Sequence, residues 1–220
     1  DVLKRRNFRK LALHSKVVLT TSIVLIVLGT VLLKFTEHIS WMGAFFHSIS
    51  ARTAGFSTYS IGEFTNAGLF VLCVLMFIGA SPGSTGGGIK TSTFFVLAQS
   101  TRSMFSKQAV GAFKRSISSQ NVSKAYAISM LSALVVIVAT FLLCVLEPEF
   151  QFIQLLFEVI SAFGTVGLST GITPDLSGAG KLVIILVMFI GRLGAMTLIS
   201  MWIERPEKMI RYTEETIAIG

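Results

Sequence analysis

One short phrase occurs twice in this chain of 220 residues. It reads TAGFST at residues 53–58 and TVGLST at residues 165–170. Each copy follows a short apolar stretch and precedes a longer one, so the two copies hold equivalent places in a repeated unit. Backbone without helical hydrogen bonds is tolerated at membrane depth only inside protein or beside water. If the chain crosses a membrane, the doubled phrase therefore predicts two loops that line one water-accessible cavity.

The composition places the chain in a bilayer. Hydrophobic residues make up 52% of it, charged residues 14%, and the mean hydropathy is +0.75, which leaves too little polar material to cover a soluble globule. A helix needs about 20 apolar residues to cross a bilayer, and three stretches are long enough, residues 17–35, 125–146 and 182–202. A fourth apolar run, residues 67–80, stops at a glycine-rich segment and then resumes, so we expect a discontinuous span.

The net charge of +8 is distributed in alternating segments. Residues 1–16 carry six Lys or Arg and one Asp, and residues 100–124 carry five and no acid, whereas residues 147–181 sum to minus three. This alternation follows the positive-inside rule for membrane proteins. It predicts that residues 1–16 and a basic linker, residues 105–123, lie in the cytoplasm, and it explains the positive charge without a nucleic-acid partner.

The repeat divides the chain into two units, residues 17–104 and 124–203, followed by a cytoplasmic tail, residues 204–220. Each unit reads as a spanning helix, a short apolar helix, a glycine loop and a second spanning helix. The short helices are residues 40–50 and 150–161, the first glycine loop is residues 51–58 and the second glycine loop is residues 163–171. Because the short helices cannot cross a bilayer, each should dip in and return. We expect an all-α integral membrane protein with two helix, pore-helix, filter-loop and helix units of potassium-channel type.

The two glycine loops have the composition of an ion filter. A dehydrated potassium ion needs oxygen atoms in place of its water, and backbone carbonyls of an extended loop supply them. Glycine adopts the backbone angles that turn carbonyls toward an axis. Two ordinary loops that match by chance are the alternative, which the matched context of the two copies makes the weaker. The predicted filter residues are Thr53, Ala54, Gly55, Phe56, Thr165, Val166, Gly167 and Leu168, with potassium held by the carbonyls of Thr53, Ala54, Gly55, Thr165, Val166 and Gly167.

The glycine-rich central loop, residues 81–91, invites a nucleotide-binding interpretation that its spacing excludes. A P-loop ends in Gly-Lys-Ser/Thr after a strand, whereas here Ile89 separates Gly88 from Lys90 and a membrane helix precedes the loop. Three consecutive glycines are poorly helical, so this loop should be soft. Arg192 lies ten residues into the last apolar stretch, where a charge costs roughly 2.5 to 3.5 kcal/mol and must face a pore or a partner.

These motifs together resemble the Trk/Ktr/HKT superfamily of potassium transporters, and within it the membrane subunits of bacterial Ktr potassium uptake systems. The resemblance rests on the two TxGxST-type loops, on GSTGGGIKT at residues 83–91 and on GRLG at residues 191–194, and it covers the chain from about residue 17 to its end. It implies potassium translocation through a single-glycine filter, without enzymatic chemistry or an organic cofactor. It also implies that the central loop is a movable gate beneath the filter. The gate residues are Gly83, Gly86, Gly87, Gly88, Lys90 and Arg192.

The resemblance further implies an assembly. Such subunits have four units around one pore, and this chain matches the third and fourth, so the two N-terminal repeats must come from elsewhere. Because Asp1 is not a natural start, we expect the C-terminal half of a longer subunit. The family forms homodimers on a cytosolic nucleotide-binding ring with a Rossmann-type fold, and these subunits are multi-pass proteins of the bacterial inner membrane. The C-terminal tail is expected near the dimer interface, with a frayed amphipathic helix as the alternative.

Several other residues carry weaker expectations. Glu158 and His47 lie in the two short helices, and either is a partner of a filter loop or is exposed at the outer vestibule. Arg52 is expected to anchor the first glycine loop. Cys73 and Cys144 lie inside apolar runs, where a thiol acts as a small hydrophobe, so we expect neither a disulfide nor a metal site.

Two other kinds of protein compete with this interpretation. A secondary carrier would use Lys90 and Arg192 to bind an anionic substrate at a broken helix. Such broken helices should recur in both units, but the last helix of the second unit contains only Gly191 and Gly194 and no comparable loop. A non-conducting membrane scaffold would leave the paired glycine loops unexplained.

Overall fold

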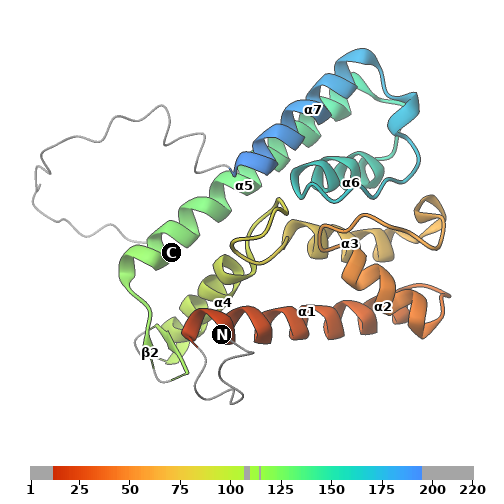
Figure 1. Ribbon diagram of the computed structural model, residues 1–220. Helices are drawn as coiled ribbons and strands as arrows, with labels where there is room; N and C mark the ends of the chain where they lie inside the picture. Colours follow the sequence, from red (N-terminus) through yellow and green to blue (C-terminus); the bar gives the residue numbers. More distant parts are fainter. Residues whose placement is uncertain (1–11, 107–109, 114, 195–220) are drawn as a thin grey trace, which may run out of the picture.

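The computed structural model describes residues 12–106, 110–113 and 115–194, and this part of the chain is almost wholly helical (Figure 1). The first unit contains α1 (Leu13–Thr36), α2 (Trp41–Ser50), a short 3-10 helix η2 (Ile61–Glu63), α3 (Asn66–Phe77) and α4 (Thr91–Ser106). A two-stranded antiparallel hairpin of β1 (Gly111–Ala112) and β2 (Arg115–Ser116) follows. The second unit contains α5 (Ser119–Leu146), α6 (Phe152–Phe163), a 3-10 helix η3 (Thr173–Asp175) and α7 (Gly178–Leu193).

Three helices of the two units begin with the same kind of cap. Ser40, Thr65 and Ser177 each precede a helix, and each side-chain oxygen accepts a hydrogen bond from the backbone N–H three residues later. Such caps satisfy one of the free N–H groups at a helix start. Since α3 and α7 begin 112 residues apart, as Gly55 and Gly167 do, the sequence repeat is a structural repeat.

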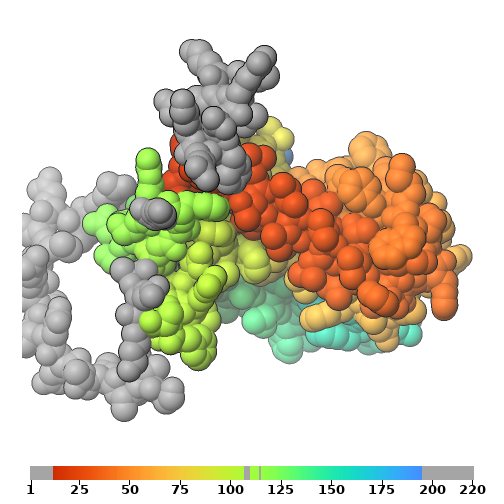
Figure 2. All heavy atoms as spheres, turned by 90° about the horizontal axis from the view of Figure 1, so that it is seen from below, coloured from red at the N-terminus to blue at the C-terminus, as the bar shows by residue number. Residues whose placement is uncertain are grey.

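Among the described residues, two helices are long and apolar enough to cross a membrane, α1 with 24 residues and α5 with 28. Both expose large apolar side chains along most of their length, Ile23 and Val27 on α1 and Ile137 and Phe141 on α5 among them. In Figure 2, α1 (red) extends across the molecule from the region of α4 and the hairpin to the region of α2. Outward-facing apolar surface on spanning helices is what lipid requires.

The helix bounds differ from the sequence expectations in several places. α6 runs from Phe152 to Phe163, two residues later at each end than the expected short helix, residues 150–161. α5 begins at Ser119, six residues before the apolar stretch, because Ser118 caps it. α7 ends at Leu193, where Gly194 has a φ of 82°, so the predicted span of residues 182–202 is not one described helix. Residues 195–220, including the tail, and residues 1–11 lie outside the described residues.

The core surrounds α6. Its residues Leu155, Phe157 and Phe163 are at most 2% exposed, and they pack with Leu72 and Met76 of α3 and Leu143 of α5 in one apolar cluster. From Phe157 to Phe163 every residue of α6 is buried, so this end of the helix is packed on all sides. The second glycine loop therefore leaves a closely packed helix end.

One buried glutamate closes each unit, Glu37 in the first and Glu147 in the second, and neither is among the residues expected from the sequence. Glu37 ends α1 and accepts hydrogen bonds from the Thr65 backbone N–H at 2.9 Å and hydroxyl at 2.7 Å. Glu147 ends α5 and accepts one from the Ser177 N–H at 2.9 Å. A signal was present, since each glutamate follows a spanning stretch and each Thr or Ser is followed three residues later by a glycine.

Replacing Glu37 with Ala should destabilise the first unit by roughly 1–2 kcal/mol, because the start of α3 loses an acceptor and a favourable negative charge. Thermal unfolding of the full-length subunit in detergent would measure this loss. Glu63→Ala is the matched control, because that side chain is exposed. Equal melting temperatures for the two variants would contradict the role of Glu37 as a clamp.

Candidate ion-conduction site

The first glycine loop leaves the end of α2 in a strained conformation. Thr53 has a φ of 73° and Gly55 a φ of 79°. The backbone N–H groups of Ala54 and Gly55 both reach the Ser50 carbonyl, at 3.0 and 3.1 Å. The Ser50 hydroxyl donates to the carbonyl of Phe56. These bonds hold the loop in a tight turn directly beyond the helix.

The second glycine loop repeats this conformation. Thr165 has a φ of 50° and Gly167 a φ of 95°, and the Val166 N–H reaches the Ser161 carbonyl at 2.9 Å. A β-branched residue with positive φ is an outlier. Such strain costs about 1–3 kcal/mol per residue and persists only where the surrounding structure imposes it, commonly at functional sites. Of the described residues other than glycine, only Thr53, Phe113 and Thr165 have positive φ.

The two glycine loops meet each other. A β-carbon placed on Gly55 would lie 2.0 Å from the carbonyl oxygen of Val166, and one placed on Gly167 would lie 3.9 Å from the α-carbon of Gly55. One placed on Gly62, just beyond the first loop, would lie 2.6 Å from the carbonyl oxygen of Thr170. The structure thus brings together the two sets of residues predicted as a filter.

The central loop lies against the threonines of both glycine loops. The Gly87 N–H donates to the Thr165 hydroxyl at 2.8 Å, and a β-carbon on Gly86 would lie 2.5 Å from the Thr53 hydroxyl oxygen. The ends of the loop are joined where Ile89 donates to the Phe77 carbonyl at 3.0 Å. The central loop therefore folds back on itself and lies beside the two strained turns. Figure 1 shows it between α3 and α4.

Both basic residues assigned to the gate bond to the central loop. Lys90 Nζ donates to the Gly86 carbonyl, and Arg192 Nη1 donates to the Thr85 carbonyl across 107 residues of sequence. Arg192 lies in the last turn of α7, where the helix dipole favours a positive charge, rather than at the middle of a continuous span. Gly83 has a φ of 81° and open space around it, so it forms the outer turn of the loop.

Three polar residues flank the glycine loops. Glu158 is 5% exposed and faces the end of the second glycine loop, and His47 is fully buried beside the end of the first. The interpretation that they are partners of the loops is therefore favoured over exposure at a vestibule. The Arg52 guanidinium donates to the carbonyls of Ser22 and Gly79, both at 3.4 Å, which ties the first glycine loop to α1 and to the start of the central loop.

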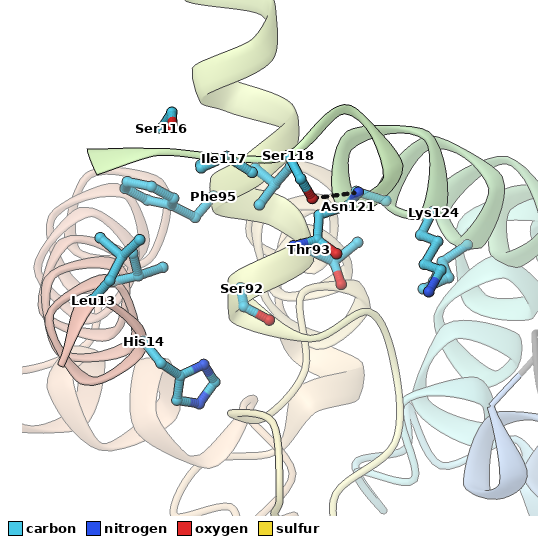
Figure 3. A pocket seen from close by; sticks show the side chains of 14 residues that line it. Leu13, His14, Ser92, Thr93, Phe95, Ser116, Ile117, Ser118, Asn121 and Lys124 are labelled. Atoms are coloured by element: carbon cyan, nitrogen blue, oxygen red, sulfur yellow. Dashed lines mark hydrogen bonds between the residues drawn. The ribbon is translucent and has the colours of Figure 1, made fainter. Parts of the chain in front are cut away.

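A cavity of about 530 Å³ lies apart from the glycine loops, between the first turns of α1, α4 and α5 (Figure 3). His14 and Lys124 flank it, with Ser92 and Thr93 between them. None of its lining residues belongs to the predicted filter or gate.

The sulfur chemistry is unremarkable and no metal cluster is present in the described part. Cys73 and Cys144 are both free thiols. Across residues 12–106, 110–113 and 115–194, no group of three or more His, Cys, Asp or Glu side chains is placed to hold a metal ion.

These features define a helical membrane protein built from two repeated units of helix, short helix, strained loop and helix. The chain belongs to the TrkH family of cation transport proteins, whose family model matches residues 8–211. The Ktr system potassium uptake protein B of Vibrio alginolyticus is 41% identical over an alignment of 230 positions, which covers 98% of this chain and 50% of that protein.

Other relatives are also named as uptake proteins or transporters. The potassium/sodium uptake protein NtpJ of Enterococcus hirae is 38% identical over an alignment of 240 positions, which covers 100% of this chain and 53% of that protein. The crystal structure of the potassium transporter TrkH from Vibrio parahaemolyticus superposes with a TM-score of 0.66 at 22% identity, over 86% of this chain and 43% of that one, which shows a shared fold. The chain spans about half the length of the curated relatives that it matches.

Proposed function

We propose that this chain supplies two of the units that surround the pore of a potassium uptake transporter. The observation that carries the proposal is the pair of strained glycine loops, with Thr53 and Thr165 at positive φ and Gly55 packed against the Val166 carbonyl. Relatives over the full chain are named as potassium uptake proteins and, in one case, as a potassium/sodium uptake protein. Potassium is the cargo, coordinated by the carbonyls of Thr53 to Gly55 and of Thr165 to Gly167.

The central loop acts as the gate of this pore. It contacts Thr165 through the Gly87 N–H, so it lies next to the proposed ion path. Lys90 and Arg192 each donate to one of its carbonyls and place positive charge where a cation would pass. Moving the loop would open the path and carry the charge of Lys90 away from it.

The assembly follows from the same proposal. Residues 17–104 and 124–203 act as the third and fourth pore units, and two N-terminal repeats complete the ring. A second subunit, a cytosolic nucleotide-binding ring and the bacterial inner membrane complete the system, with the linker, the N-terminal segment and the tail in the cytoplasm. Exposed residues of the glycine loops such as Phe56, 70% exposed here, face the missing units.

The carrier for an anionic substrate remains the competing function. The end of α7 at Gly194 removes one argument against it, because a helix now ends in the second unit near the position where α3 ends in the first. What favours the cation pore is that Lys90 and Arg192 already donate to loop carbonyls. An anion site would instead leave these donors directed at the substrate.

Potassium or rubidium uptake by the full-length subunit, in cells deficient in potassium import, tests the proposal. Gly167→Ser should lower uptake or the preference for potassium over sodium at least about tenfold, equal to roughly 1.4 kcal/mol. A side chain fits in the open space beside Gly167, but the φ of 95° is strained for any residue except glycine.

Wild-type uptake must be measured at matched voltage and sodium concentration. If the wild-type subunit carries no cation, or if Gly167→Ser changes nothing, the pore is the wrong interpretation. Uptake of an anion that depends on Lys90 and Arg192 would then identify the carrier.

A further inference from the structure

Glu158 and His47 occupy the same position in the two units. They lie 111 residues apart in α6 and α2, the offset that aligns the two short helices. Each is at most 5% exposed, and each contacts the threonine that ends its TxGxST phrase, Thr170 or Thr58. In both units this position therefore contacts the end of the glycine loop, with a carboxylate in the second unit and an imidazole in the first.

The Glu158 carboxylate accepts hydrogen bonds from three residues at and just beyond the end of the second glycine loop. Oε1 accepts from the Ser169 hydroxyl at 2.7 Å, from the Thr170 N–H at 2.9 Å and from the Thr170 hydroxyl at 3.2 Å. Oε2 accepts from the Thr173 hydroxyl at 2.8 Å. The Ser169 oxygen in turn accepts from the Gly171 N–H at 2.9 Å. One side chain therefore orients the chain from residue 169 to residue 173.

This network starts two residues beyond Gly167. A β-carbon on Gly167 would meet only the Gly55 α-carbon, at 3.9 Å, so open space lies where a side chain would project, and the backbone there is positioned by the residues on either side. On one side Thr165 is bonded to the central loop. On the other side Leu168, 4% exposed, packs in the core, and the Glu158 network holds the chain directly beyond it. Hydrogen bonds to a carboxylate are shorter and stronger than neutral ones.

His47 provides a weaker attachment in the first unit. Its Nε2 lies 3.5 Å from the Thr58 hydroxyl, at the outer limit of a hydrogen bond. Its buried Nδ1 has no hydrogen-bond partner within the described residues. The ring is instead surrounded by Tyr59 and Phe64, with ring centroids 5.9 and 5.5 Å away. Packing holds this residue, and only one hydrogen bond reaches the loop.

We propose that Glu158 is a positioning residue for ion selectivity. Its carboxylate, acting through Ser169 and Thr170, fixes the carbonyls around Gly167 at the spacing that favours potassium over sodium. The end of the second glycine loop is thereby held by more side-chain hydrogen bonds than the end of the first. This inference rests on the proposed pore function and adds a residue that touches no ion.

The test is the ratio of rubidium to sodium uptake by the full-length subunit, normalised to the amount of protein in the membrane. Glu158→Ala should lower the ratio about tenfold, and Thr173→Val, which removes one donor at nearly constant shape, about two- to threefold. Glu158→Gln keeps an acceptor oxygen, so its loss in the uptake ratio should lie between the losses of Glu158→Ala and Thr173→Val. Glu149→Gln, the same change at an exposed carboxylate, should leave the ratio unchanged.

The comparison of ratio with total uptake separates positioning from folding. A merely structural role would reduce the amount of subunit or both ion fluxes together, at a constant ratio. If Glu158→Ala does not reach the membrane, Glu158→Gln and Thr173→Val decide, because an unchanged ratio in both overturns the inference. His47→Gln should change the ratio less than Glu158→Gln, and an equal or larger change would overturn the ranking of the two loops.

Failure of this inference is distinguishable from failure of the pore. If the wild-type subunit carries rubidium with a clear preference over sodium, and the Glu158 variants keep that preference, only the positioning role is wrong. If the wild-type subunit carries neither ion, the proposed function as part of a potassium pore is itself wrong.

Discussion

Gly55→Ala should abolish potassium uptake. The new β-carbon would lie 2.0 Å from the Val166 carbonyl oxygen and 3.0 Å from its carbon, so backbone of the facing loop must move. The φ of 79° adds strain that alanine does not tolerate. We expect uptake to fall at least about a hundredfold, equal to roughly 2.7 kcal/mol. Rubidium uptake per unit of membrane-inserted subunit is the measurement.

The contrast with other glycines makes this prediction specific. Gly178→Ala is the matched control, because Gly178 has negative φ and a β-carbon there meets nothing within 4 Å. Gly55→Ala should also be more severe than Gly167→Ser, since the space beside Gly167 is open. Near-normal uptake by Gly55→Ala would mean that the two glycine loops do not meet in the working transporter.

Arg192→Ala should raise ion flux under conditions in which the wild-type subunit is closed. The substitution removes a charged donor to the Thr85 carbonyl and with it the only described contact of α7 with that carbonyl. A charge-assisted hydrogen bond is worth about 1.5–3 kcal/mol, which corresponds to a roughly ten- to hundredfold change in the open population. Single-channel or liposome flux recordings of the assembled system would measure it.

The control for this prediction is Arg102→Ala, which removes an exposed arginine from α4, away from the central loop. Lys90→Ala should act in the same direction as Arg192→Ala, because it also frees a carbonyl of the loop. Unchanged closed-state flux in Arg192→Ala would remove Arg192 from the gate and leave its bond to Thr85 as a structural contact only.

Much of the fold could be predicted from the sequence, because the length and hydropathy of an apolar run indicate a membrane helix. The helices α1, α2, α5 and α6 overlap the apolar runs that predict them, and the expected discontinuous span is interrupted after Phe77, close to the predicted break. The internal repeat supplied the rest, since an element found in one unit is expected in the other. The comparisons confirm the family and the all-helical membrane fold.

The helix ends were less predictable, because they depend on caps and not on hydropathy. Ser118 starts α5 before its apolar stretch, and Gly194 stops α7 within one. The buried glutamates were missed for a related reason. Glu37 and Glu147 are ordinary polar residues at the ends of spanning helices. Their hydrogen-bond donors come from the starts of α3 and α7, which lie beside them only in the folded chain.

The sequence by itself determined that this chain is a membrane protein of two repeated units with two glycine loops, because hydropathy and repetition are local properties of the chain. Only the tertiary structure decided what those loops touch. The approach of Gly55 to Val166, the bond from Gly87 to Thr165 and the four bonds to Glu158 join residues from separate elements. Such contacts arise from how packed helices bring loop ends together, which no local pattern specifies.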